Sequence, residues 1–413
     1  MTQTIAIIGA GIVGISTALW LQRDGHDVIV VDRKDPGEGA SHGNGGVLAS
    51  CSVVPVTVPG LIAKAPRMLL DPNQPLFLKW AYLPRLLPWR TKFLSHANAA
   101  DAARIARAMF PIVGDSLADH QSLAAGTEAE RYIVPADYLY LYNSRAHYEG
   151  DAFGWGLRRE AGFTWSELEA EAFKAYDDIF SPDIGFAACL GNHGRITDPG
   201  AYVKALARHL QAQGGRVIRA DVQDVVREGG QVTGIRAGGE TIPCDAAVVA
   251  LGAWSGPLAK SLGVSVPLES ERGYHLELWE PSVMPKAPVM IASGKFVATP
   301  MEGRIRLAGV VEFGGLKASP SRAPFDLLRR NIRAAIPGLT WKHEVEWQGH
   351  RPAPADSIPV IGEVAGIKGA WMGFGHHHVG LTGGPKTGRL LAQMISGRTP
   401  NVDVSAYSPS RFT

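Results

Sequence analysis

Cysteine is scarce in this chain, and neither sign of charge is in excess. The 413 residues include three cysteines, Cys51, Cys189 and Cys244, which are widely spaced and form no C-x-x-C pair, so neither a disulfide framework nor a zinc site is indicated. The 41 lysines and arginines nearly balance the 39 aspartates and glutamates, and the net charge of +2 gives no global field that would attract nucleic acid. We therefore expect no nucleic-acid partner.

Long apolar runs and a targeting sequence are also missing. No stretch approaches the roughly 18 uninterrupted apolar residues that suggest a membrane-spanning helix. The first residues carry no basic region ahead of their apolar run, which argues against a signal peptide and favours a cytoplasmic location. The composition is that of a globular protein, 46% apolar and 19% charged. Because ordinary domains have about 100–200 residues, we expect two of them.

The chain opens with a strand–helix–strand pattern. Residues 4–9 form a short apolar run, residues 12–24 show helical spacing of apolar side chains, and residues 27–32 form a second apolar run. This order predicts a βαβ unit with parallel strands. Further along, Asp198 followed by Pro199 predicts the start of another helix.

The turn between the first strand and its helix fits G-x-G-x-x-G, a dinucleotide-binding pattern. Gly9 would permit the turn, Gly11 would let the backbone approach a pyrophosphate, and Gly14 would let the helix pack on the strand. Asp32, at the end of the second strand, is placed to accept hydrogen bonds from ribose hydroxyls, and an acid there disfavours NADP. The hexad predicts FAD or NAD and does not choose between them.

Several later stretches resemble the D-amino acid oxidase superfamily of FAD-dependent oxidoreductases, especially its bacterial D-amino acid dehydrogenase and glycine oxidase branches. They are the loop ASHGNGG at 40–46, Asp221-Val222, VVALGAWS at 248–255, GHRP with the following D-x-x-P-x-I-G at 349–362, and GHHHVGLTG at 375–383. The resemblance runs from residue 4 to about 396. It implies an FAD that is not covalently attached, because the last cysteine is Cys244 whereas the sarcosine oxidase branch uses a cysteine late in the chain.

The resemblance also implies the FAD-binding residues. They are Gly9, Gly11, Ile12, Val13, Gly14, Asp32, Arg33, Ser41, Asn44, Gly45, Gly46, Val222, Gly252, Trp254, Gly380, Leu381 and Thr382. Independently of the family, the glycine-rich residues 375–388 precede a helical stretch, LLAQMI, whose N-terminus would face a ligand that needs negative charge stabilised. In a flavoenzyme that ligand is the ring edge that becomes anionic on reduction.

Three residues are candidates for substrate chemistry. Arg351 is implied to hold a substrate carboxylate, which a guanidinium does through two parallel hydrogen bonds, although it could instead tie two domains together. Tyr274 is implied to help bind that carboxylate, or it is a buried tyrosine whose hydroxyl merely finds a partner. His378 could contact substrate or assist loss of the amine proton. We expect no metal, since three consecutive histidines at 376–378 cannot easily ligate one ion.

The expected fold class is α/β. A Rossmann-like FAD-binding domain of the glutathione reductase type would comprise residues 1–50, 191–262 and 346–413. A substrate-binding domain of α+β type, with a mainly antiparallel sheet, would be interleaved with it as residues 51–190 and 263–345.

The expected reaction is FAD-dependent oxidative deamination or dehydrogenation of a small D-amino or cyclic imino acid, such as D-proline or a hydroxyproline, by hydride transfer from the α-carbon to flavin N5. The alternatives are a glycine- or sarcosine-type amine oxidase, a flavoprotein subunit of a heteromeric dehydrogenase, and an NAD-dependent dehydrogenase. The electron acceptor would be a quinone, another carrier or O₂.

Residues 55–95 combine aromatic and basic side chains and precede an alanine-rich helical stretch at 98–125. Their aromatic residues and leucines are Trp80, Tyr82, Leu83, Leu86, Leu87, Trp89 and Phe93, and their basic residues are Lys79, Arg85, Arg90 and Lys92. This surface could dock on anionic lipid, as a peripheral contact on the inner membrane face. The alternative is a pair of short helices over a substrate cavity, with the basic residues toward water.

Overall fold

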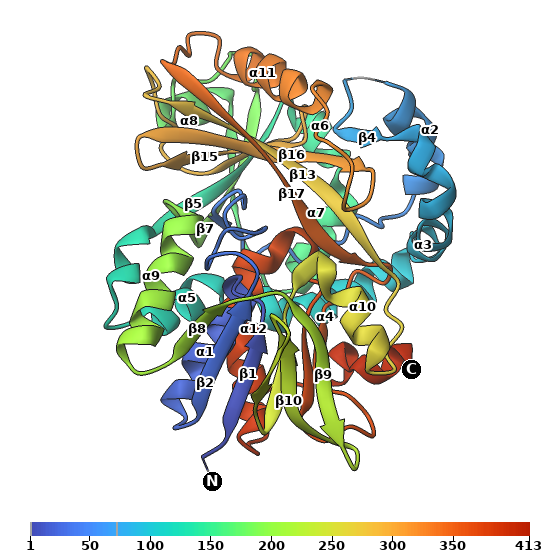
Figure 1. Cartoon of the computed structure of the whole chain (residues 1–413). Helices are drawn as coiled ribbons and strands as arrows, with labels where there is room; N and C mark the ends of the chain where they lie inside the picture. The colour runs from blue at the N-terminus through green and yellow to red at the C-terminus, as the bar shows by residue number, and fades with distance from the viewer. Residues whose placement is uncertain (1, 72) are drawn as a thin grey trace.

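The computed structural model describes residues 2–71 and 73–413, so Met1 and position 72, which falls in the segment 55–95, lie outside the described residues. Two large sheets dominate the molecule, one in the lower part of Figure 1 and one in the upper part. The chain passes between them several times, as the colours show. No helix in the described part is long and apolar enough to cross a membrane.

The six-stranded sheet has the order β18-β19-β12-β1-β2-β8. Its strands are β1 (Thr4–Ile8), β2 (Asp27–Asp32), β8 (Arg216–Arg219), β12 (Ala246–Val249), β18 (Val360–Glu363) and β19 (Ala370–Phe374). Every neighbouring pair is parallel except β18 with β19. The helix α1 (Ile12–Arg23) joins β1 to β2, which confirms the predicted βαβ unit. The strands are buried on both faces, as expected for a parallel sheet between two layers.

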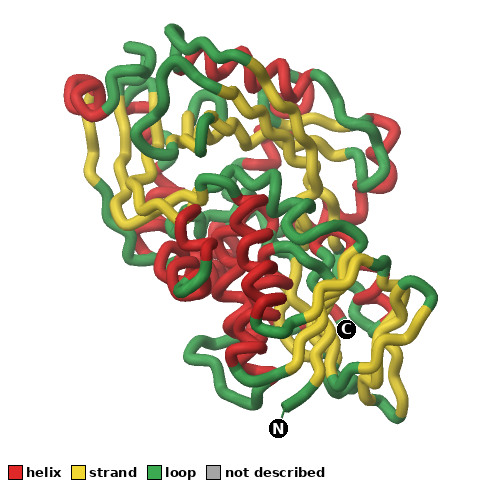
Figure 2. The backbone as a smooth tube through the Cα atoms, turned by 60° about the vertical axis from the view of Figure 1, so that its left-hand side comes forward, coloured by secondary structure: helices red, strands yellow, loops and turns green. Residues whose placement is uncertain are grey.

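Helices cover one face of this sheet, and a small sheet covers the other (Figure 2). The helix layer includes α1, α9 (Pro199–Ala212) and α12 (Gly380–Ile395). The small antiparallel sheet consists of β9 (Val222–Glu228), β10 (Gln231–Ala237) and β11 (Glu240–Pro243), and Val225, Val232 and Ile235 bury its inner face. As predicted, Asp198 caps α9, its side chain accepting a hydrogen bond from the Ala201 amide at 2.9 Å.

The ten-stranded sheet is mainly antiparallel, with the order β17-β13-β16-β15-β14-β5-β7-β3 and two strands off this path. Its strands are β3 (Val47–Leu48), β4 (Leu76–Leu78), β5 (Ile133–Tyr142), β6 (Ser166–Glu169), β7 (Phe186–Ile196), β13 (Leu268–Trp279), β14 (Val289–Ile291), β15 (Phe296–Met301), β16 (Arg304–Phe313) and β17 (His343–Pro354). Its parallel pairs are β5 with β14 and β4 with β16. The predicted fold class is confirmed. The expected domain boundary at residue 346 falls inside β17, and the division into domains stays a proposal.

The remaining helices surround these sheets. They are α2 (Leu61–Leu70), α3 (Leu83–Ser95), α4 (Ala99–Val113), α5 (Ser116–Ala124), α6 (Arg145–Glu149), α7 (Ala152–Glu160), α8 (Ala170–Tyr176), α10 (Ser255–Ser261) and α11 (Ala323–Ala335), with 3-10 turns η1 (Trp80–Tyr82), η2 (Glu128–Tyr132), η3 (Gly252–Trp254), η4 (His377–Val379), η5 (Ser405–Tyr407) and η6 (Pro409–Phe412). The helical stretch 98–125 is two helices, α4 and α5. The segment 55–95 forms two short helices, α2 and α3, as in the second of the two alternatives for this segment, and the strand β4 between them was not predicted.

The start of α12 corrects one expectation. The glycine-rich residues 375–388 are not all loop before a helix, because α12 already begins at Gly380. Its glycines serve helix packing: a Cβ at Gly388 would lie 2.6 Å from the backbone of Ser16 in α1, and one at Gly383 would lie 2.5 Å from Ile112 in α4. The glycines that resemble a loop in the sequence therefore let α12 approach two other helices closely.

Candidate active site between the two sheets

A cavity of about 900 Å³ lies where the six-stranded and ten-stranded sheets meet. Its wall includes the start of α1, the residues that follow β2, the start of β9, the inner face of β13 and β17, and the start of α12. Helices α2 and α3 contribute an apolar wall that includes Leu61, Leu86, Trp89 and Phe93. The cavity thus joins residues that are more than 300 positions apart in the sequence.

The N-terminus of α1 faces one end of this cavity. Gly9 adopts φ +121°, and a Cβ there would lie 2.3 Å from the carbonyl oxygen of Ala250. A Cβ at Gly14 would lie 1.9 Å from the carbonyl oxygen of Gly9, so this glycine lets the helix meet the turn. The N-cap residue Gly11 supplies no side-chain hydrogen bond, and the first turn contains no acidic residue. The positive end of the helix dipole is therefore left for an anion in the cavity.

Side chains beside this helix end suit an adenosine group. The Asp32 carboxylate accepts hydrogen bonds from the amides of Ala10 at 2.8 Å and Lys34 at 3.0 Å, and retains lone pairs for ribose hydroxyls. The guanidinium of Arg33 lies 4.4 Å from the ring centre of Trp254. Asp32, Arg33 and Trp254 line the cavity together with Val222.

The other end of the cavity lies at the start of α12. The Asn44 side-chain amide donates to the carbonyl oxygen of His378 at 3.4 Å, and its Oδ1 accepts from the Gly46 amide at 2.9 Å. Gly46 itself lies off the cavity wall with φ +77°, and a Cβ there would be 2.8 Å from the carbonyl oxygen of Ile196. Gly46 therefore shapes the loop and does not line the cavity.

The helix α5 supports this end from behind. Ser116 donates to the carbonyl oxygen of Thr382 at 2.9 Å, and His120 Nε2 lies 2.9 Å from the carbonyl oxygen of Leu381. His120 Nδ1 lies 2.8 Å from the hydroxyl of Tyr202. Because a carbonyl oxygen only accepts, Nε2 of His120 must carry a proton, and Tyr202 donates to Nδ1 of the neutral ring. The neutral form of His120 therefore holds the backbone of Leu381, which lines the cavity.

This arrangement predicts acid sensitivity. Burial lowers the pKa of His120 to about 4, from 6.5 in the unfolded chain. Between pH 6.5 and pH 4, His120 is therefore protonated in the unfolded chain and neutral in the folded chain. The stabilisation of the folded chain by neutral His120 is complete above pH 6.5 and is lost as the pH falls toward 4. The loss should be on the order of 2 kcal/mol at pH 5. Glutamine cannot be protonated, so we expect the Tm of His120→Gln to fall less than the Tm of the wild type between pH 7.5 and pH 5. Equal falls in Tm for the two proteins would contradict this role of His120.

Together the two ends fit FAD. The cavity is lined by the N-terminus of α1, whose first turn has no acidic residue, by a carboxylate suited to ribose hydroxyls, and by the N-terminus of α12, as a dinucleotide with a flavin ring requires. Of the residues predicted to bind FAD, Gly9, Gly14 and Gly46 lie behind the wall, and the others line it. The three cysteines are free, and none of them lies on the cavity wall, which agrees with a cofactor that is not covalently attached.

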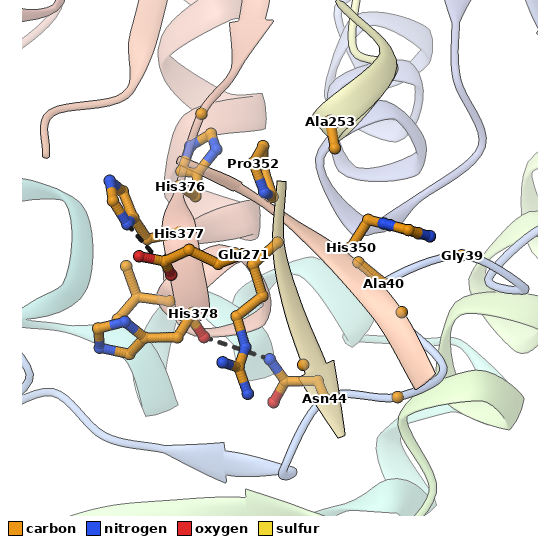
Figure 3. A pocket seen from close by; sticks show the side chains of 18 of the residues that line it. Gly39, Ala40, Asn44, Ala253, Glu271, His350, Pro352, His376, His377 and His378 are labelled. Carbon is orange, nitrogen blue, oxygen red and sulfur yellow. Dashed lines mark hydrogen bonds and ion pairs between the residues drawn. The ribbon is translucent and has the colours of Figure 1, made fainter. Parts of the chain in front are cut away.

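Four charged or titratable side chains line the cavity near the start of α12, and three of them, Glu271, His377 and His378, are labelled in Figure 3. The fourth is Arg351 on β17, which is the cross-strand neighbour of Glu271 on β13. Gly273 makes room for the guanidinium, because a Cβ there would lie 2.7 Å from Arg351 Cζ. His377 Nδ1 lies 3.6 Å from Glu271 Oε2.

The surroundings set the charges of this cluster. Burial alone would raise the pKa of Glu271, but His377 and Arg351 outweigh burial and lower it. Burial lowers the pKa of Arg351 while Glu271 opposes the shift. Loss of solvation inside the cavity that it lines, with the charges of His377 and Arg351, lowers the pKa of His378 to about 4. At neutral pH the cluster therefore presents a carboxylate, a guanidinium and a neutral His378.

The structure does not bring Tyr274 to this cluster, which corrects the predicted role in substrate binding. Its hydroxyl donates to Glu312 at 2.7 Å and accepts from the Ser321 amide at 3.0 Å. Side chains alternate along a strand, so Glu271 and Gly273 face the cavity while Tyr274 packs in the core on the opposite face, beside Phe325 of α11. The alternative that its hydroxyl merely finds a partner is the one that the structure supports.

Other cavity residues were missed by sequence reasoning. Glu271 carries no motif of its own, although the alternation of side chains along a strand places it on the same face as Gly273, two residues later. Arg158 of α7 also lines the cavity, with Nη2 donating to the Tyr140 hydroxyl at 3.1 Å and its guanidinium 4.7 Å from the ring centre of Trp155. No local sequence pattern indicates that Arg158 lines the cavity. Among the described residues no group of three or more side chains could hold a metal ion.

The parallel sheet with its glycine turn, and the cavity beside it, define a dinucleotide-binding protein whose site suits a flavin. A family model described as FAD dependent oxidoreductase matches residues 4–394. This chain belongs to that family, the D-amino acid oxidase (DAO) family, and its cofactor is FAD.

Individual proteins agree with this assignment. A D-amino-acid oxidase of Bradyrhizobium diazoefficiens is 37% identical, with 99% of this chain and 98% of that protein covered. A D-amino acid dehydrogenase of the same organism is 29% identical over 99% of this chain and 98% of its own length. Among solved structures, glycine oxidase from Geobacillus kaustophilus has a TM-score of 0.76 at 19% identity and 100% coverage of both chains. L-Proline dehydrogenase from P. horikoshii has a TM-score of 0.76 at 17% identity, covering 100% and 98% of the two chains.

Proposed function

We propose that this enzyme oxidises the bond between the α-carbon and the nitrogen of a small D-amino or cyclic imino acid. The observation that carries the proposal is the half-buried guanidinium of Arg351, which lines the cavity beside Glu271 and makes no ion pair with Glu271 among the described residues. Such a guanidinium binds a carboxylate through two parallel hydrogen bonds and fixes the α-carbon. FAD, when bound, supplies the hydride acceptor.

The side chain of the substrate would face an apolar wall. Phe313 is the neighbour of Glu271 across β16, and Leu78 of β4 is the neighbour of Phe313. Both line the cavity, with Leu86 and Phe93 of α3 beyond them. Apolar burial favours a substrate with carbon beyond the α-position over glycine. The two D-specific relatives described above support the D-configuration.

The chemistry can be tested directly on the purified holoenzyme. Candidate substrates are added one at a time without oxygen, and the visible band of the oxidised flavin is followed. The panel contains D- and L-proline, hydroxyproline isomers, D-alanine, D-arginine, glycine and sarcosine. We expect one D-amino or cyclic imino acid to bleach the band, and readmitted O₂ or added quinone then identifies the electron acceptor by its rate of reoxidation. A flavin that stays oxidised with every compound would overturn the proposal and favour the subunit of a heteromeric dehydrogenase.

The segment 55–95 supports a peripheral membrane contact if the acceptor is a quinone. Three large apolar side chains off the cavity wall are exposed there, Ile62 at 59%, Trp80 at 58% and Leu87 at 39%. The basic residues Arg85 and Lys92 of α3 are exposed nearby, whereas Leu86, Trp89 and Phe93 are buried toward the cavity. The buried face of this segment thus forms part of the cavity wall. Its exposed face carries both apolar and basic side chains and is amphipathic.

A further inference from the structure

We propose that Glu271 binds the amino group of the substrate and accepts its proton, so that Glu271 and Arg351 together hold both charges of an amino acid. This inference rests on the proposed function and adds a catalytic residue to it. The two side chains stand directly opposite each other on neighbouring strands and point to the same face of the sheet. Both line the cavity, which makes them a matched pair for a zwitterion.

The carboxylate of Glu271 retains hydrogen-bonding capacity for a ligand. Its side chain is buried, and its ion-pair partner among the described residues is His377, at 3.6 Å, which is longer than a hydrogen bond. A buried carboxylate whose nearest ion-pair partner lies 3.6 Å away is incompletely paired, and an ammonium group in the cavity would supply a closer donor. Glu269, two residues earlier on the same strand, is a contrast, because it accepts from the Tyr82 hydroxyl at 3.0 Å and from the Ser270 amide at 2.7 Å.

His377 holds this carboxylate in place. Its Nε2 lies 3.1 Å from the carbonyl oxygen of Pro354 and must carry a proton to donate there. Its Nδ1 lies 3.6 Å from Glu271 Oε2, so the imidazole ring borders the carboxylate. The backbone of His377 has φ +48°, a left-handed conformation that is costly for a residue with a side chain. His377 is thus a positioning residue, and the groups that face Glu271 are His377, His378 and Arg351.

The proton balance follows from this arrangement. The substrate enters as an ammonium carboxylate, and one N–H proton moves to a carboxylate oxygen of Glu271. The lone pair left on nitrogen forms the C=N bond as the α-hydrogen leaves with its two electrons to the oxidised flavin. The product is an iminium carboxylate, and Glu271 returns its proton to water when the product departs. His378 is neutral because its pKa is lowered to about 4, and it need not carry this proton.

Binding of two unreactive ligands tests the amine contact without turnover. 2-Aminoisobutyrate has a carboxylate and an ammonium group but no α-hydrogen, and isobutyrate has the same carbon skeleton without nitrogen. We expect wild-type holoenzyme to bind 2-aminoisobutyrate at least about tenfold more tightly than isobutyrate, measured by calorimetry or by perturbation of the flavin spectrum. Glu271→Gln should abolish this preference while keeping its FAD. Glu269→Gln, a buried glutamate on the same strand but off the cavity wall, should preserve the preference.

The pH profile tests the proton transfer. With the substrate found above, flavin reduction in Glu271→Gln should be about 10²-fold slower at pH 7 and should rise about tenfold per pH unit until the substrate amine is neutral. The wild-type rate should change far less over that range. A Glu271→Gln variant with wild-type ligand preference and pH profile overturns this inference, as does a wild type that binds neither ligand or binds both equally. The proposed function is tested by a different result: it is contradicted if the wild-type flavin stays oxidised with every compound of the substrate panel.

Discussion

Replacing Arg351 by methionine is expected to slow reduction of the flavin by its amino acid substrate by about 10³-fold, while the protein remains yellow. Truncating one partner of a buried, hydrogen-bonded charge pair typically costs about 2–5 kcal/mol, and misalignment of the α-carbon adds to that loss. Isobutyrate binding should weaken in parallel, since it depends on the carboxylate contact. Stopped-flow reduction and ligand titration of the holoenzyme measure both effects.

Two further variants separate the carboxylate contact from other roles of this arginine. Arg351→Lys keeps a charge but loses the two parallel donors, so an intermediate loss of about 10²-fold is expected. Arg330→Met removes an exposed arginine on α11 and should leave reduction unchanged. If Arg351→Met instead lost its FAD or its thermal stability, with an unaltered reduction rate in the surviving holoenzyme, the alternative that Arg351 ties two domains together would be favoured.

Gly14→Ala is expected to yield a chain that does not retain FAD. The new Cβ would lie 1.9 Å from the carbonyl oxygen of Gly9, a backbone atom that cannot move without opening the turn between β1 and α1. Because that turn aims the helix N-terminus into the cavity, the shift would weaken cofactor binding by well over 10²-fold. The measurement is the flavin-to-protein absorbance ratio after gel filtration, followed by titration of the stripped protein with FAD.

Gly156→Ala is a matched control for that substitution. Gly156 also lies inside a helix, α7, but a Cβ there would meet nothing within 4 Å. Alanine should keep FAD bound and raise stability by about 0.5–1 kcal/mol, since glycine is unfavourable in a helix interior. Retention of FAD by Gly14→Ala at the wild-type ratio would show that close packing at this position is not required.

The sequence predicted the cofactor end of the site much better than the substrate end. The hexad at 9–14 and Asp32 are informative because a dinucleotide is recognised by backbone close to one turn and by one acid at the end of the next strand. These residues lie within one short stretch of the chain, so their pattern can be recognised from the sequence alone. The start of α12 was misplaced because glycine permits both a loop and close helix packing, and only the partners Ser16 and Ile112 distinguish them.

The substrate end depends on which face of a strand points inward. Tyr274 and Glu271 lie three residues apart on β13, and the alternation of side chains sends them to opposite faces. Sequence resemblance favoured the tyrosine, whereas the cross-strand pairing that brings Glu271 to Arg351 involves positions 80 residues apart. Such a pairing depends on register between distant strands, which no local window contains.

The order of strands in the six-stranded sheet has a consequence for biosynthesis. The strand β1 is flanked by β2 and β12, and β19 adds to β12 only after residue 370 has been made. Contacts between such distant segments form slowly, because a long loop must be closed before they contribute stability. A ribosome-bound chain that still lacks α12 thus carries the glycine turn at 9–14 without the second wall of its cofactor cavity. FAD capture therefore waits until α12 has been made, and we expect flavin supplied from that stage on to stabilise the folded chain.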